Sequence, residues 1–203
     1  IVFGCQNIRS LAKNFDDLLE VRRDQAISVL FLVETWHDSD SVYLRRLRAD
    51  GCQVLERARP RSRVDTLSTN HGGVAAVAVP GIRLSLLDLG VRPETFELLC
   101  VRVVSGSSSC VVATVYRPGS AAITSAFFAE LSDMFLVGDI NVHLERATEF
   151  NACQLTEVLE VHGLVNRVSG PTHDRGGTLD IIASRDDLEP PQVDSLSVGT
   201  SDH

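Results

Sequence analysis

The sequence predicts an α/β fold in which mixed β-sheets are covered by helices. Apolar runs of strand length, separated by turns that contain Gly, Pro and Ser, recur along the whole chain. Between them lie stretches with apolar residues at three- and four-residue intervals, which is the period of an amphipathic helix. Because helices are interspersed among the strands, this order favours sheets covered by helices over an all-β barrel.

The first elements show both patterns. A buried strand is predicted at 2–6, and an amphipathic helix follows over 10–25 with Ser10 as its expected N-cap. Leu11 and Phe15 lie one helical turn apart on the apolar face of that helix. Further strands are predicted at 28–33, 53–55, 74–79, 83–89, 96–104, 110–116, 135–138, 178–183 and 193–198. Further helices are predicted at 40–49, 123–133 and 149–162.

We expect a single domain over 1–203, because no repeat, low-complexity tract or Pro/Gly-rich linker divides the chain. No apolar run approaches the roughly 20 residues that cross a bilayer, and no basic leader precedes an apolar stretch. The chain is therefore predicted to be neither membrane-spanning nor secreted. Its first residue is Ile1 and not Met, so we expect a fragment of a longer polyprotein.

The five cysteines are scattered, odd in number and never spaced as Cys-x-x-Cys. This pattern argues against a cysteine metal site. Most of them have apolar neighbours, where a free thiol behaves as a small hydrophobic group. A reducing compartment is therefore expected.

The net charge of −8 is concentrated in the last third, where residues 139–203 hold 12 acidic and 4 basic residues. This distribution excludes a strongly basic DNA-binding domain. Local contacts with phosphate remain compatible with it, since 18 of the 19 basic residues are Arg, which binds phosphate in a bidentate fork. Arg57, Arg59, Arg61 and Arg63 share one polar segment, which we interpret as a solvated loop.

Polar residues recur where the predicted strands end. Strand ends on one rim of a sheet converge in space, so carboxylates that are distant in sequence can share one ion. Oxygen ligands from Asp, Glu and Asn suit magnesium or manganese better than zinc. The residues at these positions are Asn7, Glu34, Tyr116, Arg117, Asp139 and Asn141. Asp180 lies inside the strand predicted at 178–183, and Asp202 and His203 close the chain.

Each of these positions is weak evidence alone. An Asp-x-Asn segment such as Asp139 to Asn141 is often only a turn, and Glu34 alone would usually be a solvated residue at the end of a strand. Asp180 is more informative, because a charge between Leu179 and Ile181 in a core strand needs a partner. Their occurrence together on one chain favours a catalytic site with a divalent metal over a set of unrelated turns.

The same segments carry a family resemblance that covers nearly the whole chain. The sequence resembles the endonuclease/exonuclease/phosphatase superfamily, and within it the apurinic-type endonuclease domain of non-LTR (LINE-like) retrotransposons. The matching motifs are Asn7 to Leu11, Glu34-Thr35-Trp36, His71 to Ala75, Tyr116-Arg117-Pro118, Gly138 to His143, Pro171-Thr172-His173, Gly177 to Asp180 and Ser201-Asp202-His203.

The resemblance implies a four-layer α/β/β/α sandwich of two mixed β-sheets with the site at one end. The last strand of this fold, expected after His203, is lacking from the sequence. The implied activity is that of a magnesium- or manganese-dependent hydrolase that nicks target DNA for retrotransposon insertion. A reverse-transcriptase domain would then lie in the same polyprotein. Localisation in the nucleus would follow from that role, with the cytoplasm as the other expectation.

The resemblance also assigns roles to individual residues. Asn7, Glu34 and Asp202 correspond to metal ligands, and Asp139 with Asn141 corresponds to the groups that orient the attacking water. Tyr116 and Asp180 correspond to groups around the scissile phosphate. His203, held by Asp202, corresponds to a phosphate-contacting histidine or general base. Arg117 and Thr172 correspond to contacts with the substrate backbone.

Two alternatives stay open beside the DNA endonuclease. One is a phosphatase of the phosphomonoesterase or phosphoinositide type, because the acidic balance suits a small substrate better than long DNA. The other is a non-catalytic remnant. It is motivated by the short connection between the helix ending near Asp133 and the strand beginning at Phe135, since such connections usually take about 2–6 residues.

Overall fold

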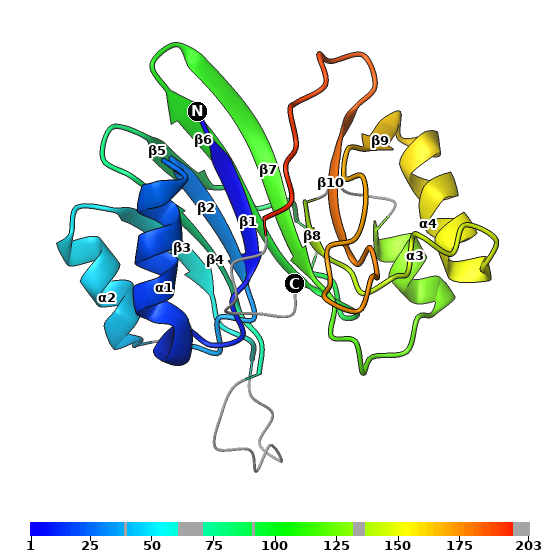
Figure 1. The fold of residues 1–203 in the computed structure, drawn as a ribbon, viewed down its shortest axis with the longest axis horizontal. Helices are drawn as coiled ribbons and strands as arrows, with labels where there is room; N and C mark the ends of the chain where they lie inside the picture. Colours follow the sequence, from blue (N-terminus) through cyan, green and yellow to red (C-terminus); the bar gives the residue numbers. More distant parts are fainter. Residues whose placement is uncertain (39, 61–70, 91, 132–136, 197–203) are drawn as a thin grey trace.

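The computed structural model describes residues 1–38, 40–60, 71–90, 92–131 and 137–196. Two β-sheets pack face to face in the middle, and helices cover the outer face of each, so that the molecule has four layers (Figure 1). This arrangement confirms the predicted α/β/β/α sandwich of two mixed sheets. No helix in the described part of the chain is long and apolar enough to cross a membrane.

The first sheet has four strands in the order β1-β2-β4-β3. β1 and β2 are parallel, and the other neighbours are antiparallel, which makes the sheet mixed. Helices α1 and α2 lie on its outer face (Figure 1). These elements are β1 (Phe3–Asn7), α1 (Leu11–Asp24), β2 (Val29–Val33), α2 (Val42–Ala49), β3 (Gln53–Arg57) and β4 (Val74–Ala78).

The second sheet has six strands in the order β5-β6-β7-β8-β10-β9. Only β7 and β8 are parallel in this sheet. Helices α3 and α4 cover the half of its outer face formed by β7 to β9 (Figure 1). These elements are β5 (Arg83–Leu86), β6 (Glu97–Ser105), β7 (Ser108–Tyr116), α3 (Ser125–Leu131), β8 (Val137–Asp139), α4 (Phe150–Val161), β9 (Leu164–Asn166) and β10 (Asp180–Arg185).

The core explains why β2 is a continuous apolar run. Successive side chains of a strand point to opposite faces of the sheet. Val29, Phe31 and Val33 pack into the cluster between the two sheets, whereas Leu30 and Leu32 pack beneath the helices. Because both faces of β2 are covered, every position along it is buried and apolar.

The topology brings several strand ends to one rim. β1 and β2 run in parallel, so Asn7 and the residue after Val33 emerge at the same edge of the first sheet. In the second sheet, Asp139 lies opposite Tyr116 on β7 and opposite Asp180 on β10. Polar residues that are far apart in the sequence therefore gather at one end of the sandwich.

Some element predictions were wrong. β9 was not expected, because it has three residues of which only Leu164 is buried, too few to show an alternating pattern. The predicted strand at 193–198 is absent over its described part, 193–196, which carries no regular structure. The short connection predicted near 133–135 falls mostly outside the described residues, as does the closing segment with Asp202 and His203.

Candidate active site

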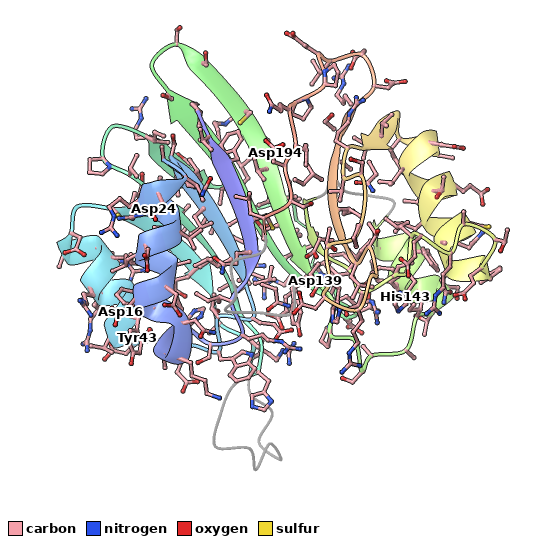
Figure 2. All side chains as sticks on the ribbon, viewed as in Figure 1. Asp16, Asp24, Tyr43, Asp139, His143 and Asp194 are labelled. Carbon is pink, nitrogen blue, oxygen red and sulfur yellow. The ribbon has the colours of Figure 1, made fainter. Side chains whose placement is uncertain are left out.

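An asparagine at the end of β1 bridges two carboxylates. The Asn7 side-chain amide donates from Nδ2 to Glu34 Oε1 and to Asp139 Oδ2, each over 3.0 Å. Asn7 is 2% exposed and Asp139 is fully buried. Asn7 ends β1 and Glu34 directly follows β2, whereas Asp139 ends β8 of the second sheet, so this amide joins the two halves of the site (Figure 2 labels Asp139).

The second oxygen of Asp139 is held by Asn141. Asp139 Oδ1 accepts from the Asn141 backbone N over 3.0 Å and from its Nδ2 over 2.8 Å. The same Nδ2 also donates to the Arg117 carbonyl over 2.9 Å. Asn141 adopts a positive φ of 49°, a conformation that Asn tolerates better than most residues. The Asp-x-Asn segment is therefore a built turn that fixes the orientation of the carboxylate.

A tyrosine completes the ring of contacts around Glu34. The Tyr116 hydroxyl donates to Glu34 Oε1 over 2.9 Å. Burial, followed by the nearby charge of Glu34 and the hydrogen bond to it, raises the pKa of Tyr116 well above its ordinary value. The phenol therefore keeps its proton at neutral pH and acts as a donor.

The backbone at Glu34 is held in an unusual conformation. Glu34 has a φ of 52°, and Trp36 two residues later has the same value. Such a conformation costs roughly 1–3 kcal/mol for a residue other than glycine, and it persists only where the surroundings fix it. Here the Ser10 backbone N donates to the Glu34 carbonyl over 2.9 Å, which ties the segment to the start of α1.

Arg117 does not occupy the position expected of a substrate contact. It is 2% exposed, and its guanidinium donates to four backbone carbonyls. Burial also lowers the pKa of Arg117 from its ordinary value. Arg117 therefore fastens the loop after β7 to the segment that carries Asn141. The four carbonyls belong to Pro118, Ala121, Ile140 and Asn141.

Thr172 lies beside Asp180 and is engaged by its backbone. The Thr172 hydroxyl accepts from the Leu179 N over 3.0 Å and from the Asp180 N over 3.1 Å. Asp180 lies opposite Asp139 in the pairing of β10 with β8. Burial, followed by the nearby charges of Asp180 and Asp139, raises the pKa of the Cys5 thiol on β1. Thr172 therefore fixes the start of β10, and its expected contact with substrate stays a prediction.

An ion pair that the sequence analysis missed lies behind Tyr116. Arg59 Nε contacts Glu97 Oε1 over 2.5 Å, and the Arg59 guanidinium lies 5.6 Å from the centre of the Tyr116 ring. Glu97 Oε2 also accepts from the Gly73 backbone N over 2.6 Å. Burial, only partly offset by Arg59 and Gly73, raises the pKa of Glu97.

The interpretation of the Arg-rich segment as a solvated loop was wrong for Arg59, whereas Arg57 is exposed but ends β3. Arg57 donates from Nη1 to the Leu98 carbonyl over 2.9 Å, and Arg59 pairs with Glu97 as above. Arg61 and Arg63 lie outside the described residues. The signal that could have revealed the pairing is Glu97 itself, an acidic residue directly before the apolar run Leu98–Val101 of β6.

The described residues supply part of a donor set for a divalent metal. Glu34 and Asp139 offer carboxylate oxygens within reach of one amide, and hard oxygen donors are what magnesium prefers. Rotating the Asn7 amide by half a turn would present its oxygen to a cation. Within the described part of the chain, no group of three or more His, Cys, Asp and Glu residues could hold a metal ion. Asp202 and His203, the remaining expected site residues, lie outside it.

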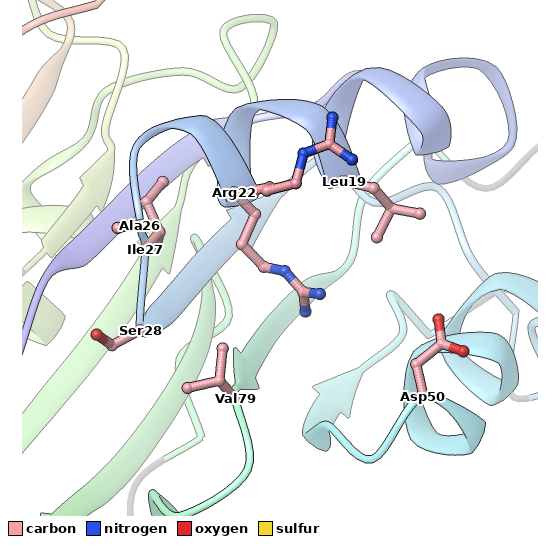
Figure 3. Close-up of a pocket in the computed structure, with 8 residues that line it drawn as sticks. Leu19, Arg22, Ala26, Ile27, Ser28, Asp50 and Val79 are labelled. Carbon is pink, nitrogen blue, oxygen red and sulfur yellow. The ribbon is translucent and has the colours of Figure 1, made fainter.

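A pocket on the surface lies away from this cluster. An open pocket at the opposite end of β2 is lined by residues that include Arg22, Ser28 and Asp50 (Figure 3). Arg22 donates from Nη1 to the Cys52 sulfur over 2.8 Å, which ties it to the packing of α2. Because Ser28 precedes β2 and Glu34 follows it, this pocket is separate from the candidate active site.

Comparison with solved structures decides the fold. The endonuclease domain of TRAS1, a telomere-specific non-LTR retrotransposon, superposes with a TM-score of 0.71 at 14% identity over 98% of this chain and 92% of that one. An AP endonuclease from Leishmania major gives a TM-score of 0.66 at 15% identity over 99% and 84% of the two chains. The fold is that of the endonuclease/exonuclease/phosphatase superfamily. This result confirms the fold that the sequence motifs had predicted.

A third structure has the same superfamily fold. The 3′ phosphatase NExo from Neisseria, bound to a product DNA hairpin, superposes with a TM-score of 0.59 at 16% identity over 90% of this chain and 85% of that one. No protein-family model and no curated protein sequence matches the chain. At these low identities, the structural likeness extends to the fold and not to the chemistry.

Proposed function

We propose that this protein is a metal-dependent phosphodiesterase that nicks DNA. The observation that carries the proposal is the cluster at the rim of the two sheets, in which Asn7, Glu34, Asp139 and Tyr116 are joined by direct hydrogen bonds. Phosphodiester hydrolysis needs an oriented water, a proton acceptor and compensation of negative charge on the phosphoryl oxygens. The buried Asp139, the partly buried Glu34 and the neutral donors of this cluster suit the first two needs.

The roles proposed for the side chains follow from their contacts. Asn7 and Glu34, with Asp202, would hold one magnesium or manganese ion, which supplies charge compensation at the phosphate when bound. Asp139 would orient the attacking water and accept its proton. Asn141 holds Oδ1 of Asp139, and Oδ2 faces Asn7 in the cluster. Tyr116 would donate a hydrogen bond beside the phosphate.

The remaining expected groups are proposed to act around that centre. Asp180 stands opposite Asp139 and would contact the phosphate region. His203, held by Asp202, is proposed as the phosphate contact or general base. Neutral donors such as Asn141 fix geometry without adding repulsive charge near a phosphate, whereas Asp180 requires a partner that offsets its charge.

DNA is the proposed substrate. The fold is shared with a retrotransposon endonuclease domain, an AP endonuclease and a phosphatase bound to a DNA hairpin. The likeness to the TRAS1 domain supports nicking of target DNA for insertion by a reverse transcriptase in the same polyprotein, acting in the nucleus. The chain would then be one domain of that polyprotein.

The direct test is a plasmid-nicking assay. Supercoiled plasmid incubated with the protein and magnesium is expected to give nicked circles, and Asp139→Asn is expected to abolish them. Asp24→Asn serves as the matched control, because Asp24 ends α1 on the surface, away from the rim (Figure 2). Folded wild-type protein that leaves the plasmid supercoiled with both magnesium and manganese would refute the endonuclease.

One observation favours a phosphatase as the second candidate. The net charge of −8 disfavours long DNA more than a small phosphate ester. Phosphate release from a 3′-phosphorylated oligonucleotide or a phosphoinositide panel, with plasmid left intact, would decide for it. A folded protein that neither turns over these substrates nor binds magnesium in calorimetry would instead be a non-catalytic remnant.

A further inference from the structure

A buried histidine next to the candidate site is bonded through both ring nitrogens. His37 is 4% exposed. Its Nε2 lies 3.1 Å from Glu56 Oε2 on β3, and its Nδ1 lies 2.5 Å from the Thr35 hydroxyl oxygen. The other oxygen of Glu56 contacts Arg48 on α2 over 3.5 Å. A chain of polar contacts thus runs from the outer helix layer to the residue that follows Glu34.

The chemistry of these groups sets the direction of the hydrogen bonds. An ionised carboxylate only accepts, so Nε2 of His37 carries a proton and donates to Glu56. In the neutral imidazole, Nδ1 then has a lone pair and accepts the hydroxyl proton of Thr35. The hydroxyl has one proton, so its 3.5 Å contact with the Gly72 carbonyl is secondary.

The Thr35 backbone is fastened from two sides. Its N donates to the Gly73 carbonyl over 3.2 Å, and its carbonyl accepts from the Leu11 N over 3.0 Å. Trp36 N donates to the Gly72 carbonyl over 2.7 Å. The segment from Glu34 to Trp36, which has positive φ at both ends, is therefore held between the entry to β4 and the start of α1.

Gly73 allows this packing. It has a φ of 96°, and a Cβ added there would lie 2.5 Å from the Thr35 hydroxyl oxygen and 3.0 Å from His37 Nδ1. The Thr35 hydroxyl and the His37 imidazole therefore occupy the space that a side chain at position 73 would need. A glycine at this position lets these two groups pack against each other beside Glu34.

We propose that Glu56, His37 and Thr35 form a positioning relay. The relay fixes the left-handed backbone conformation of Glu34 and thereby orients the Glu34 carboxylate toward the metal. None of the three is a catalytic residue, since they act through Glu34. The inference rests on the proposed function only in taking Glu34 as a metal ligand. Groups that orient a metal ligand typically change metal affinity about 10- to 100-fold when they are removed.

The test measures metal dependence in matched variants. His37→Leu and Thr35→Val each remove the bond between Nδ1 and the hydroxyl, and Glu56→Gln weakens the bond to Nε2. Each is expected to raise the magnesium concentration for half-maximal nicking by about 10-fold or more, with KM for plasmid at saturating magnesium unchanged. Thr35→Ser, which keeps the hydroxyl, is expected to restore the wild-type value.

Thr114→Val is the matched control. Thr114 is a fully buried threonine on β7, and its hydroxyl has no hydrogen-bond partner among the described residues. Its replacement is expected to leave metal dependence unchanged. If His37→Leu and Thr35→Val also keep the wild-type magnesium requirement while folded, the relay is refuted, although the endonuclease would stand.

Two measurements separate the relay from the activity itself. Nitrogen NMR of the His37 ring is expected to show a proton on Nε2, and Thr35→Val is expected to shift Nδ1. Manganese affinity measured by calorimetry without DNA is expected to fall in the relay variants even if the wild type never nicks plasmid. Unchanged manganese affinity, or a proton on Nδ1 in the neutral ring, overturns the inference.

Discussion

The Tyr116 hydroxyl donates a hydrogen bond to the same Glu34 oxygen that accepts a hydrogen bond from Asn7. One carboxylate oxygen thus receives donors from both sheets, since Asn7 ends β1 and Tyr116 ends β7. This shared acceptor keeps the Glu34 side chain at the centre of the rim. The predictions below concern the groups that create or support this arrangement.

Removing the Tyr116 hydroxyl isolates its contribution. Tyr116→Phe keeps the ring that packs in the core but deletes the donor to Glu34. A hydrogen bond to a charged group is worth about 1.5–3 kcal/mol, so we expect single-turnover nicking to slow by roughly 10- to 100-fold. A rate within twofold of wild type, at saturating magnesium, would show that Tyr116 is only a packing residue.

Placing a third carboxylate at Asn7 tests the metal assignment. Asn7→Asp replaces a donor by an anion between Glu34 and Asp139, so the protein without metal is expected to melt at a lower temperature. A bound cation would offset that repulsion. Adding magnesium after chelator treatment should therefore raise the melting temperature of the variant more than that of wild type, as ligand binding stabilises the folded state. Equal shifts in differential scanning calorimetry would argue against metal at this position.

Arg117→Lys distinguishes a structural from a substrate-binding arginine. A lysine cannot span four carbonyls, and buried acceptors left unpaired cost about 1–3 kcal/mol each. We expect a loss of about 3 kcal/mol or more in the free energy of unfolding, measured with urea. The opposite result, unchanged stability with weaker DNA binding, would restore the role that the sequence motif suggested.

Glu97→Gln should change how stability depends on pH. Burial raises the pKa of Glu97 in the folded state, so folding favours its protonated form. Its contribution to stability is present below the ordinary carboxyl pKa and is lost as the pH rises through the raised value. The free energy of unfolding of wild type, relative to Glu97→Gln, is therefore expected to fall as the pH increases from about 4 upward through the raised pKa. A difference that stays constant or rises over that window, in urea titrations at stepped pH, would contradict it.

Two glycines with nearly the same backbone conformation provide a matched pair. Gly73 (φ 96°) faces Thr35 and His37, whereas Gly81 (φ 94°) has nothing within 4 Å of an added Cβ. Both alanine variants incur backbone strain, but only Gly73→Ala forces a clash, which costs typically about 1–3 kcal/mol more. Thermal denaturation should rank Gly73→Ala clearly below Gly81→Ala, and equal stabilities would mean that the Thr35 and His37 side chains move aside freely.

Much of the fold could be predicted from the sequence because buried faces of helices and strands require apolar residues at regular intervals. The apolar run at Val29–Val33 and the helical spacing of Leu11, Phe15 and Leu18 are direct consequences of which faces are covered. β9 shows no such spacing of apolar residues, because this edge strand of three residues has one buried position.

That Asn7, Glu34 and Asp139 lie together could be predicted from the sequence, whereas the hydrogen bonds among the residues of the candidate site could not. Polar residues at strand ends indicated Asn7, Glu34 and Asp139, since the termini of neighbouring strands must meet. Pairing of particular donors and acceptors depends on sheet-to-sheet distances that no local pattern encodes. Arg117 and Arg59 show this: the sequence places them near the site but cannot tell a guanidinium that faces solvent from one that is enclosed.

The hydrogen bond from Asn7 to Asp139 joins positions 132 residues apart. During synthesis, Asn7 and Glu34 leave the ribosome long before Asp139 does, and the hydrogen bonds that join them to Asp139 and Tyr116 cannot form until the second sheet has been made and has docked. Contacts between residues so distant in sequence are among the slower ones to form in folding. A chain of this kind would be inert toward nucleic acid while it is being translated, and it would become competent to cleave only once the sandwich is complete.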